Sequence, residues 1–302
     1  MNFDHLLNFD AETHQSGYIA IIGKPNVGKS TLLNGIIGMK LSITSDKPQT
    51  TRNRVIGIYS EEDVQMIFLD TPGIINPRYK LQQTMMNYVE QAQREADVIL
   101  FMVDATSPDY PDYAFEQLNE FHQPKFLIIN KIDMIDQEKV FKLIERYKDR
   151  CDWKEIMAVS ALKGIGTEGL VELLRKDLPK GPPFYPKEMV SEHPERFFIG
   201  EMIREQIFHQ FREEIPYSTA VHIISYDESE KIDRIHADII VDRKSQKGII
   251  IGKGGSAIKK IGVQARKEIE QFLGKQVHIQ LFVKVRENWR NNDQQLSNFG
   301  YE

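Results

Sequence analysis

Apolar residues follow two different patterns along this chain, and the change from one to the other divides it. From residue 18 to about 178, short continuous apolar runs alternate with amphipathic stretches of helical spacing. Continuous runs are typical of strands buried on both faces of a sheet that helices flank. We therefore expect strands at residues 18–22, 55–59, 64–69, 98–103, 126–130 and 156–159. The pattern predicts an α/β fold with a mainly parallel sheet and with ligand loops at the carboxyl ends of its strands.

A proline-rich break separates this region from a second pattern. Residues 178–186 carry four prolines and one glycine, which cannot continue a helix or a central strand, so a linker is expected. Apolar residues then recur at helical spacing over 199–211 and 258–272, and they alternate over 235–241 and 277–285. Alternation predicts half-exposed strands, hence a small α+β domain. We predict an N-terminal extension (1–16), an α/β domain (17–178), a linker (179–190) and the α+β domain (191–302), with 291–302 frayed.

Length and composition exclude several classes of protein. A chain of 302 residues can bury two cores, and its 41% hydrophobic and 27% charged residues are ordinary for a globular protein. No apolar run approaches the roughly 20 residues of a membrane span. Residues 1–15 lack the basic start and apolar core of a secretory signal. The single cysteine, Cys151, excludes an intramolecular disulfide and a multi-cysteine metal site. We therefore expect a cytoplasmic protein.

Charge is distributed unevenly. The formal net charge is −5, yet residues 243–290 hold twelve basic residues against three acidic ones. A basic stretch in an otherwise acidic chain indicates either a solvated face or a surface that binds a polyanion.

The strongest motif lies directly after the first predicted strand. Residues 23–30 match the phosphate-binding pattern G-x-x-x-x-G-K-[ST], and a strand followed by such a turn and a helix points backbone N–H groups at phosphate oxygens. Lys29 is expected to reach the β- and γ-phosphates and Ser30 to ligate Mg²⁺. The predicted phosphate-binding residues are Gly23, Lys24, Pro25, Asn26, Val27, Gly28, Lys29, Ser30 and Thr31.

Three further motifs each end a predicted strand, in a fixed order. Asp70-Thr71-Pro72-Gly73 places a carboxylate where it can hold Mg²⁺ through water, and Gly73 lets the backbone approach the γ-phosphate. In Asn130-Lys131-Ile132-Asp133, the carboxylate of Asp133 can accept two hydrogens from guanine, a pattern that adenine does not offer. Backbone N–H groups of Ser160, Ala161 and Leu162 could meet the guanine O6. We predict that the ligand is GTP.

The second domain carries a glycine-rich loop in a basic setting. An isoleucine-rich turn precedes Gly252-Lys253-Gly254-Gly255, and a basic helix follows it, which is typical of a KH domain that clamps about four single-stranded nucleotides. The alternative is a glycine-rich turn that only caps a helix. The predicted RNA-binding residues are Ile249, Ile250, Ile251, Gly252, Lys253, Gly254, Gly255, Lys259 and Lys260.

With these motifs, residues 18–178 resemble a GTPase domain of the translation-factor-related class, and nearly the whole chain resembles the Era family. That family joins a GTPase domain to a C-terminal type II KH domain, in the order helix, strand, strand, helix, Gly-x-x-Gly, helix, strand. The resemblance implies a monomer that binds GTP and GDP with Mg²⁺. It also implies assembly of the small (30S) ribosomal subunit, binding of the 3′ end of 16S rRNA, and peripheral contact with the inner face of the membrane.

The resemblance also assigns roles around the phosphates. Residues 48–52 (Pro-Gln-Thr-Thr-Arg) match the effector loop, whose threonine closes on Mg²⁺ when the γ-phosphate is present; we favour Thr51 and keep Thr50 open. Ile74 stands where Ras-type enzymes carry the glutamine that orients water, so we expect slow intrinsic hydrolysis. In related GTPases the asparagine equivalent to Asn26 helps to bind K⁺, and K⁺ stimulation is our hypothesis here. The predicted catalytic residues are Lys29, Thr51, Gly73 and Asn26, with Ser30, Thr51 and Asp70 at the metal.

We expect a switch in which GTP orders the loops around Thr51 and Gly73 and hydrolysis releases them, altering RNA binding. Two alternatives remain. In one, the C-terminal domain of a GTPase docks a protein or membrane partner. In the other, a non-catalytic RNA chaperone uses GTP as a structural ligand, an interpretation to which Ile74 lends some support.

Overall fold

The computed structural model describes residues 13–110 and 112–301, and the chain divides into two compact units. Unit 1 comprises Met1–Ser42, Thr51–Ile75 and Met86–Glu192, and unit 2 comprises Ile43–Thr50, Asn76–Met85 and His193–Glu302. The division after Glu192 lies close to the end of the predicted linker. The sequence did not predict that two short segments from the first half of the chain would belong to unit 2.

Unit 1 is built on a six-stranded sheet with the order β2-β3-β1-β4-β5-β6. All neighbouring strands are parallel except β2 and β3, which are antiparallel. The mainly parallel sheet is as predicted. Its strands are β1 (Gln15–Gly23), β2 (Val55–Ser60), β3 (Val64–Asp70), β4 (Val98–Asp104), β5 (Lys125–Asn130) and β6 (Glu155–Ala158). The helices along this part of the chain are α1 (Lys29–Ile37), α2 (Lys80–Glu95), α3 (Asp112–Asn119), η2 (Ile132–Met134), α4 (Gln137–Tyr147) and α5 (Thr167–Arg175).

Helices cover both faces of this sheet, which explains why its strands are continuous apolar runs. One face packs against α2, α3 and α4 in a single buried cluster that includes Ile56 and Ile58 of β2. Between those two residues, Gly57 points to the other face, where an added Cβ would lie 2.6 Å from Leu33 of α1. Helix α1 also contacts α5, so these two helices form the third layer.

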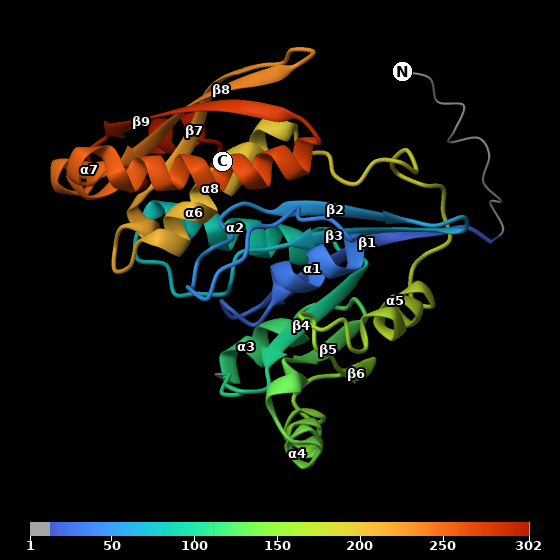
Figure 1. The fold of residues 1–302 in the computed structure, drawn as a ribbon. Helices are drawn as coiled ribbons and strands as arrows, with labels where there is room; N and C mark the ends of the chain where they lie inside the picture. Colours follow the sequence, from blue (N-terminus) through green and yellow to red (C-terminus); the bar gives the residue numbers. More distant parts are fainter. Residues whose placement is uncertain (1–12, 111, 302) are drawn as a thin grey trace. The chain divides into compact units, whose positions relative to one another are not determined.

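Unit 2 has a smaller sheet with the order β7-β8-β9, in which β7 and β8 are antiparallel and β8 and β9 are parallel. Its elements are α6 (Glu195–Gln210), η3 (Pro216–Ser218), β7 (Ala220–Asp227), β8 (Ile232–Val241), α7 (Lys244–Ile251), η4 (Lys253–Gly255), α8 (Ser256–Leu273), β9 (Gln276–Val285), η5 (Trp289–Asn291) and α9 (Asp293–Asn298). Helices α6 and α8 contact each other and pack on the sheet, as Figure 1 shows. Ile235, Ala237 and Ile239 of β8 are fully buried, as their alternation predicted.

The predicted linker contains no helix or strand, yet hydrogen bonds tie it to unit 1. Near its start, the Ser16 N–H donates to the carbonyl of Pro179 over 3.1 Å. In the middle, the Gln65 Oε1 accepts from the N–H of Tyr185 at 2.9 Å. At its predicted end, the N–H of Ile58 donates to the carbonyl of Val190 over 2.8 Å. The segment 179–191 therefore follows unit 1, and we call it the connecting strap.

The two ends of the chain differ from the prediction. Strand β1 begins at Gln15, inside the predicted extension, of which residues 1–12 lie outside the described residues. The expectation that 291–302 are frayed is wrong for the described residues up to 301. The Asn292 side chain accepts from the Gln295 N–H and caps α9, while Leu296 and Tyr301 are buried. Among the described residues, no helix has the length and apolar character needed to cross a membrane.

Candidate functional site

Asn130 connects the predicted phosphate and guanine loops within unit 1. It is the last residue of β5 and is buried. Its Nδ2 donates to the Val27 carbonyl over 2.7 Å, and its Oδ1 accepts from the Ala161 N–H at 2.9 Å. An added Cβ at Gly28 would lie 2.1 Å from the Asn130 Nδ2, so this position has room only for glycine. Loops 23–30, 130–133 and 160–162 are therefore joined through one side chain.

Lys29 opens helix α1 and is almost fully buried, with 5% of its surface exposed. Its Nζ donates to the carbonyls of Gly23 and Lys24, at 3.1 and 3.0 Å. Burial lowers the pKa of Lys29 to about 8, and the nearby Asp70 carboxylate opposes that shift only in part. The ammonium group thus lies at the N-terminus of a helix with only neutral oxygens as hydrogen-bond partners, which is a favourable setting for a phosphate.

Three oxygen-bearing side chains meet beside the lysine. The Ser30 Oγ donates to the Asp70 Oδ2 over 2.7 Å and lies 2.9 Å from the Thr51 Oγ1. The Thr50 hydroxyl instead donates to the carbonyl of Lys47 over 2.7 Å. Of the two threonines left open by the sequence, Thr51 is therefore the one whose hydroxyl lies beside Ser30, which in turn contacts Asp70.

This cluster fits Mg²⁺. Asp70 is fully buried, burial raises its pKa, and its Oδ1 has no hydrogen-bond partner among the described residues. A buried carboxylate oxygen without a donor is stabilised by a cation, and Mg²⁺ prefers oxygen ligands such as carboxylates, hydroxyls and phosphates. Asp70, Ser30 and Thr51 supply such a set.

The loop after β3 approaches the phosphate loop closely. An added Cβ at Gly73 would lie 2.4 Å from the Pro25 backbone nitrogen, and the Ile74 N–H donates to the Gly23 carbonyl over 3.0 Å. Thr71 is buried and donates to the carbonyl of Ile21. The Ile74 side chain packs against the core cluster, so it supplies no polar group near the phosphate loop. The Ile74 side chain therefore cannot orient the water that attacks the γ-phosphate, and another group must do so.

The guanine side of the site includes residues that the sequence reasoning missed. Lys131 adopts φ 67° and its Nζ lies 2.5 Å from the Asp104 Oδ2. Burial alone would raise the pKa of Asp104, but hydrogen bonds from Lys131 and Thr106 hold it below its usual range. The only available signal was the position of Asp104 at the end of β4. Among the predicted residues here, Asp133 and Leu162 are exposed and Ser160 is buried.

Tyr110 supports the phosphate loop and was also missed. Its hydroxyl donates to the Met102 carbonyl over 3.0 Å and accepts from the Lys24 N–H, while its ring lies 4.5 Å from the Lys24 Nζ. Asn26, the residue of the K⁺ hypothesis, is exposed at the tip of the same loop and adopts φ 64°. No sequence motif distinguishes Tyr110 from other aromatic residues.

In unit 2, the glycine-rich loop lies between two helices. The predicted isoleucine-rich turn is helical: α7 runs to Ile251, and the Gln246 side chain accepts from the N–H groups of Asp242 and Arg243 at its start. Ile250, one of the predicted RNA-binding residues, is fully buried, because helical spacing turns its side chain into the core. Ile249, the preceding residue, is 49% exposed.

The loop itself is open. Gly254 and Gly255 adopt φ 59° and 78°, and an added Cβ at either would meet no heavy atom within 4 Å. Gly252 also has a positive φ but is crowded by Ala257. The side chains of Lys253, Lys259 and Lys260 are all exposed. The backbone and lysines therefore leave space for a chain of phosphates to approach.

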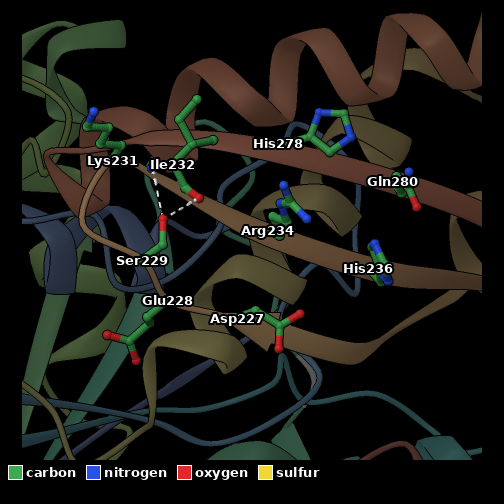
Figure 2. Close-up of a pocket in the computed structure, with 9 residues that line it drawn as sticks. All are labelled: Asp227, Glu228, Ser229, Lys231, Ile232, Arg234, His236, His278 and Gln280. Carbon is green, nitrogen blue, oxygen red and sulfur yellow. Dashed lines mark hydrogen bonds between the residues drawn. The ribbon is translucent and has the colours of Figure 1, made fainter.

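A separate pocket lies on unit 2 and contains none of the predicted site residues (Figure 2). Arg234 and His236 of β8 lie in register with His278 and Gln280 of β9, on the sheet face opposite the buried Ile235. The lining consists of Asp227, Glu228, Ser229, Lys231, Ile232, Arg234, His236, His278 and Gln280. No sequence motif predicts this pocket, because it depends on the register of β8 and β9.

Two protein families match separate parts of the chain. Residues 18–131 match a family described as 50S ribosome-binding GTPase, and residues 214–290 match the KH domain family. Both predicted domain types are confirmed.

Solved structures match the chain over almost its whole length. Era in complex with MgGDPNP and nucleotides 1506–1542 of 16S ribosomal RNA is 42% identical, with a TM-score of 0.92, covering 95% of this chain and 99% of that one. A single-site variant of Aquifex aeolicus Era bound to GDP·AlF₄⁻ is also 42% identical, with a TM-score of 0.91 and the same coverage.

Proposed function

The chain belongs to the Era family, and we propose that it is a GTP-hydrolysing switch that binds the 3′ end of 16S rRNA and assists assembly of the 30S subunit. The observation that carries the proposal is the joining of the guanine and phosphate loops by Asn130, next to a buried lysine. Such an arrangement selects a guanine nucleotide and stabilises charge on its phosphates.

The description of the GTPase family names the 50S subunit, whereas the RNA in the matching Era structure is 16S, the RNA of the small subunit. The family match covers only residues 18–131, while the Era match covers both domains. Because the Era match includes the KH domain and the GTPase family match does not, we assign the small subunit.

Within the nucleotide site, we propose that Ser30, Thr51 and Asp70 hold Mg²⁺, which would neutralise charge on the phosphates. Lys29 would bind β- and γ-phosphate oxygens, and the backbone at Gly73 would donate to the γ-phosphate. Asp133, exposed after β5, would accept hydrogens from the guanine base. The metal role is supported by the distances from the Ser30 Oγ to the Asp70 Oδ2 (2.7 Å) and to the Thr51 Oγ1 (2.9 Å).

We further propose that K⁺ at Asn26 raises the hydrolysis rate, because the Ile74 side chain cannot orient water. Turnover in potassium buffer should then exceed turnover in sodium buffer, and Asn26→Ala should abolish the difference. Gln137→Ala, which removes an exposed amide at the start of α4, serves as the control. Equal turnover of the wild-type protein in both buffers would disprove the K⁺ role and leave the GTPase assignment intact.

In unit 2, Gly252, Gly254 and Gly255 would let the RNA backbone approach, Lys253 would contact phosphate, and Ile249 and Ile251 would offer an apolar surface for bases. Lys259 and Lys260 would add charge along α8. We propose a monomer that acts in the cytoplasm and touches the inner membrane only peripherally. The alternative, docking of a protein or membrane partner by this domain, predicts RNA binding that is independent of the loop.

Crosslinking to RNA in cells, followed by sequencing, tests the proposal. We expect the wild-type protein to enrich the 3′ end of 16S rRNA and the double variant Lys253→Asp, Gly254→Asp to lose that enrichment. Lys139→Asp, at an exposed lysine on α4, controls for the change of charge. Enrichment that the double variant retains, or none in the wild type, would support the alternative.

A further inference from the structure

Helix α6 buries three consecutive polar side chains. Arg204 and Glu205 are each 1% exposed and Gln206 is 7% exposed. Burying a charged group costs folding free energy unless hydrogen-bond or ion-pair partners replace the lost water. The partners of these residues therefore identify the segments to which α6 is bonded. Gln206 donates to Glu268 of α8 over 2.7 Å, a contact within the body of unit 2. Arg204 and Glu205 have different partners.

Their partners lie on the segment Ile43–Thr50, which belongs to unit 2 by its contacts. The Glu205 Oε1 accepts from the N–H of Thr44 at 2.9 Å, and the Arg204 Nη2 donates to the carbonyl of Thr50 over 2.6 Å. Between these two points, the Lys47 ammonium donates to the Phe208 carbonyl, one of the carbonyls left free at the C-terminal end of α6. Helix α6 therefore holds both ends and the middle of this segment.

The held segment ends immediately before Thr51. A peptide unit is planar and stiff, so fixing the Thr50 carbonyl restricts where the next residue can lie. Thr51 is the residue whose hydroxyl lies 2.9 Å from the Ser30 Oγ. Glu201 engages the Arg204 guanidinium on a second side, with its Oε1 2.7 Å from the Arg204 Nε, so the arginine is itself held in place.

We propose that Arg204 and Glu205 are positioning residues for the nucleotide site. By holding the segment Ile43–Thr50, they keep Thr51 where it can respond to Mg²⁺ and the γ-phosphate. This inference rests on the proposed GTPase function and on the proposed role of Thr51. It adds that the helix opening the RNA-binding unit determines how strongly the protein prefers GTP over GDP.

The consequence is a selective effect on one nucleotide. Thr51 is expected to act only when a γ-phosphate is present, so releasing the segment should weaken binding of GDPNP and slow hydrolysis while GDP binding stays unchanged. A purely structural role for Glu205 would weaken both nucleotides together, because a loosened fold affects the whole site. The ratio of the two affinities therefore separates positioning from general destabilisation.

The experiment measures GDPNP and GDP affinities of the full chain, with Mg²⁺, by titration. We expect Glu205→Ala to lower GDPNP affinity by about tenfold, the loss of one charge-assisted hydrogen bond, with GDP affinity within twofold of wild type. Glu205→Gln should restore most of the loss, because an amide oxygen can still accept from the Thr44 N–H. Gln206→Ala, the buried neighbour that contacts only α8 among the partners described above, should leave the ratio unchanged.

Equal losses for both nucleotides, or no loss for Glu205→Ala, would overturn the inference. If Glu205→Ala does not fold, Lys47→Ala decides the question from the segment side, with an expected GDPNP loss of about threefold and none for GDP. If the wild-type protein binds GDPNP and hydrolyses GTP, but the variants keep the wild-type ratio of GDPNP to GDP affinity, only this inference is disproved. A wild-type protein without GTPase activity would instead sink the proposed function.

Discussion

The buried charges of the nucleotide site in unit 1 and a buried carboxylate in unit 2 are held in opposite ways. In unit 1, burial lowers the pKa of Lys29 to about 8 and raises the pKa of Asp70, so both groups are pushed towards their neutral forms. In unit 2, the Ser229 N–H and the Lys275 ammonium hold the pKa of Asp233 below its ordinary value. A buried group whose pKa is shifted towards its neutral form is typical of a ligand-binding site. A charged group whose pKa shift favours the charged form, because it has partners in the chain, stabilises the fold.

The glycines of the two units are required for different reasons, one for lack of space and the other for its backbone conformation. Gly28 is required by crowding, because a Cβ there would lie 2.1 Å from the Asn130 Nδ2. Gly254 has open space around it and is required only by its left-handed backbone, at φ 59°. A closely packed nucleotide site and an open RNA loop should therefore respond differently to the same substitution.

The largest expected effect is at Gly28. Gly28→Ala should lower GTP affinity by at least ~100-fold, because the added methyl displaces Asn130 and strains a backbone at φ 102°. A titration with a fluorescent GTP analogue measures the change. RNA affinity should stay at the wild-type level.

Gly35→Ala is the matched control in the adjoining helix, where the added Cβ meets only the Ala161 carbonyl at an ordinary 3.7 Å. It should leave GTP affinity unchanged. Wild-type GTP binding by Gly28→Ala would mean that the site is far more plastic than its contacts indicate, and the comparison between the units would fail.

A smaller effect is expected at Gly254. Gly254→Ala should lower RNA affinity by about tenfold, since a left-handed conformation costs an alanine roughly 1–2 kcal/mol. Gly254→Asn should lose much less, because asparagine tolerates this conformation. Filter binding of a 16S 3′-end oligonucleotide measures both. Equal losses for alanine and asparagine would show that the space around Gly254, rather than its backbone, is what RNA requires.

The smallest effect concerns Asp233. Because its folded pKa lies below the ordinary 3.8, its stabilising contribution is complete above pH 3.8 and is lost as the pH falls through the folded value. Asp233→Asn should lower the unfolding temperature of unit 2 by about 3 °C at pH 7, and the difference should shrink below pH 3.8. Asp238→Asn, on the same strand, is the control. A deficit that persists in acid would point to lost hydrogen bonds rather than to charge.

The α/β fold and the nucleotide loops could be predicted from the sequence because their signals are local. Residues 98–103 of β4 are apolar without interruption because helices cover both faces of the sheet. Lys29, Ser30 and Asp70 were found because phosphate and metal chemistry restricts both the residue type and its place after a strand. Thr51 could be separated from Thr50 only by the contacts of the folded chain.

The failures of prediction arose where tertiary contacts override local preference. The isoleucines before the glycine-rich loop have extended preferences, yet Gln246 caps α7 and Ile250 enters the core, so the segment is helical. The polar composition of the C-terminus predicted fraying, but Leu296 and Tyr301 are buried. The segment Ile43–Thr50 carries no sign that its partners lie about 160 residues further along the chain.

The connecting strap has a consequence for aggregation and for where the chain can be cut. Strand β2 is an outer strand of its sheet, and outer strands with free N–H groups invite pairing with other molecules. In the strap, the Val190 carbonyl accepts a hydrogen bond from the Ile58 N–H of β2, so this N–H group is not free to pair with another molecule. A fragment ending at residue 178 would uncover it and should self-associate, whereas one ending at residue 192 should remain dispersed.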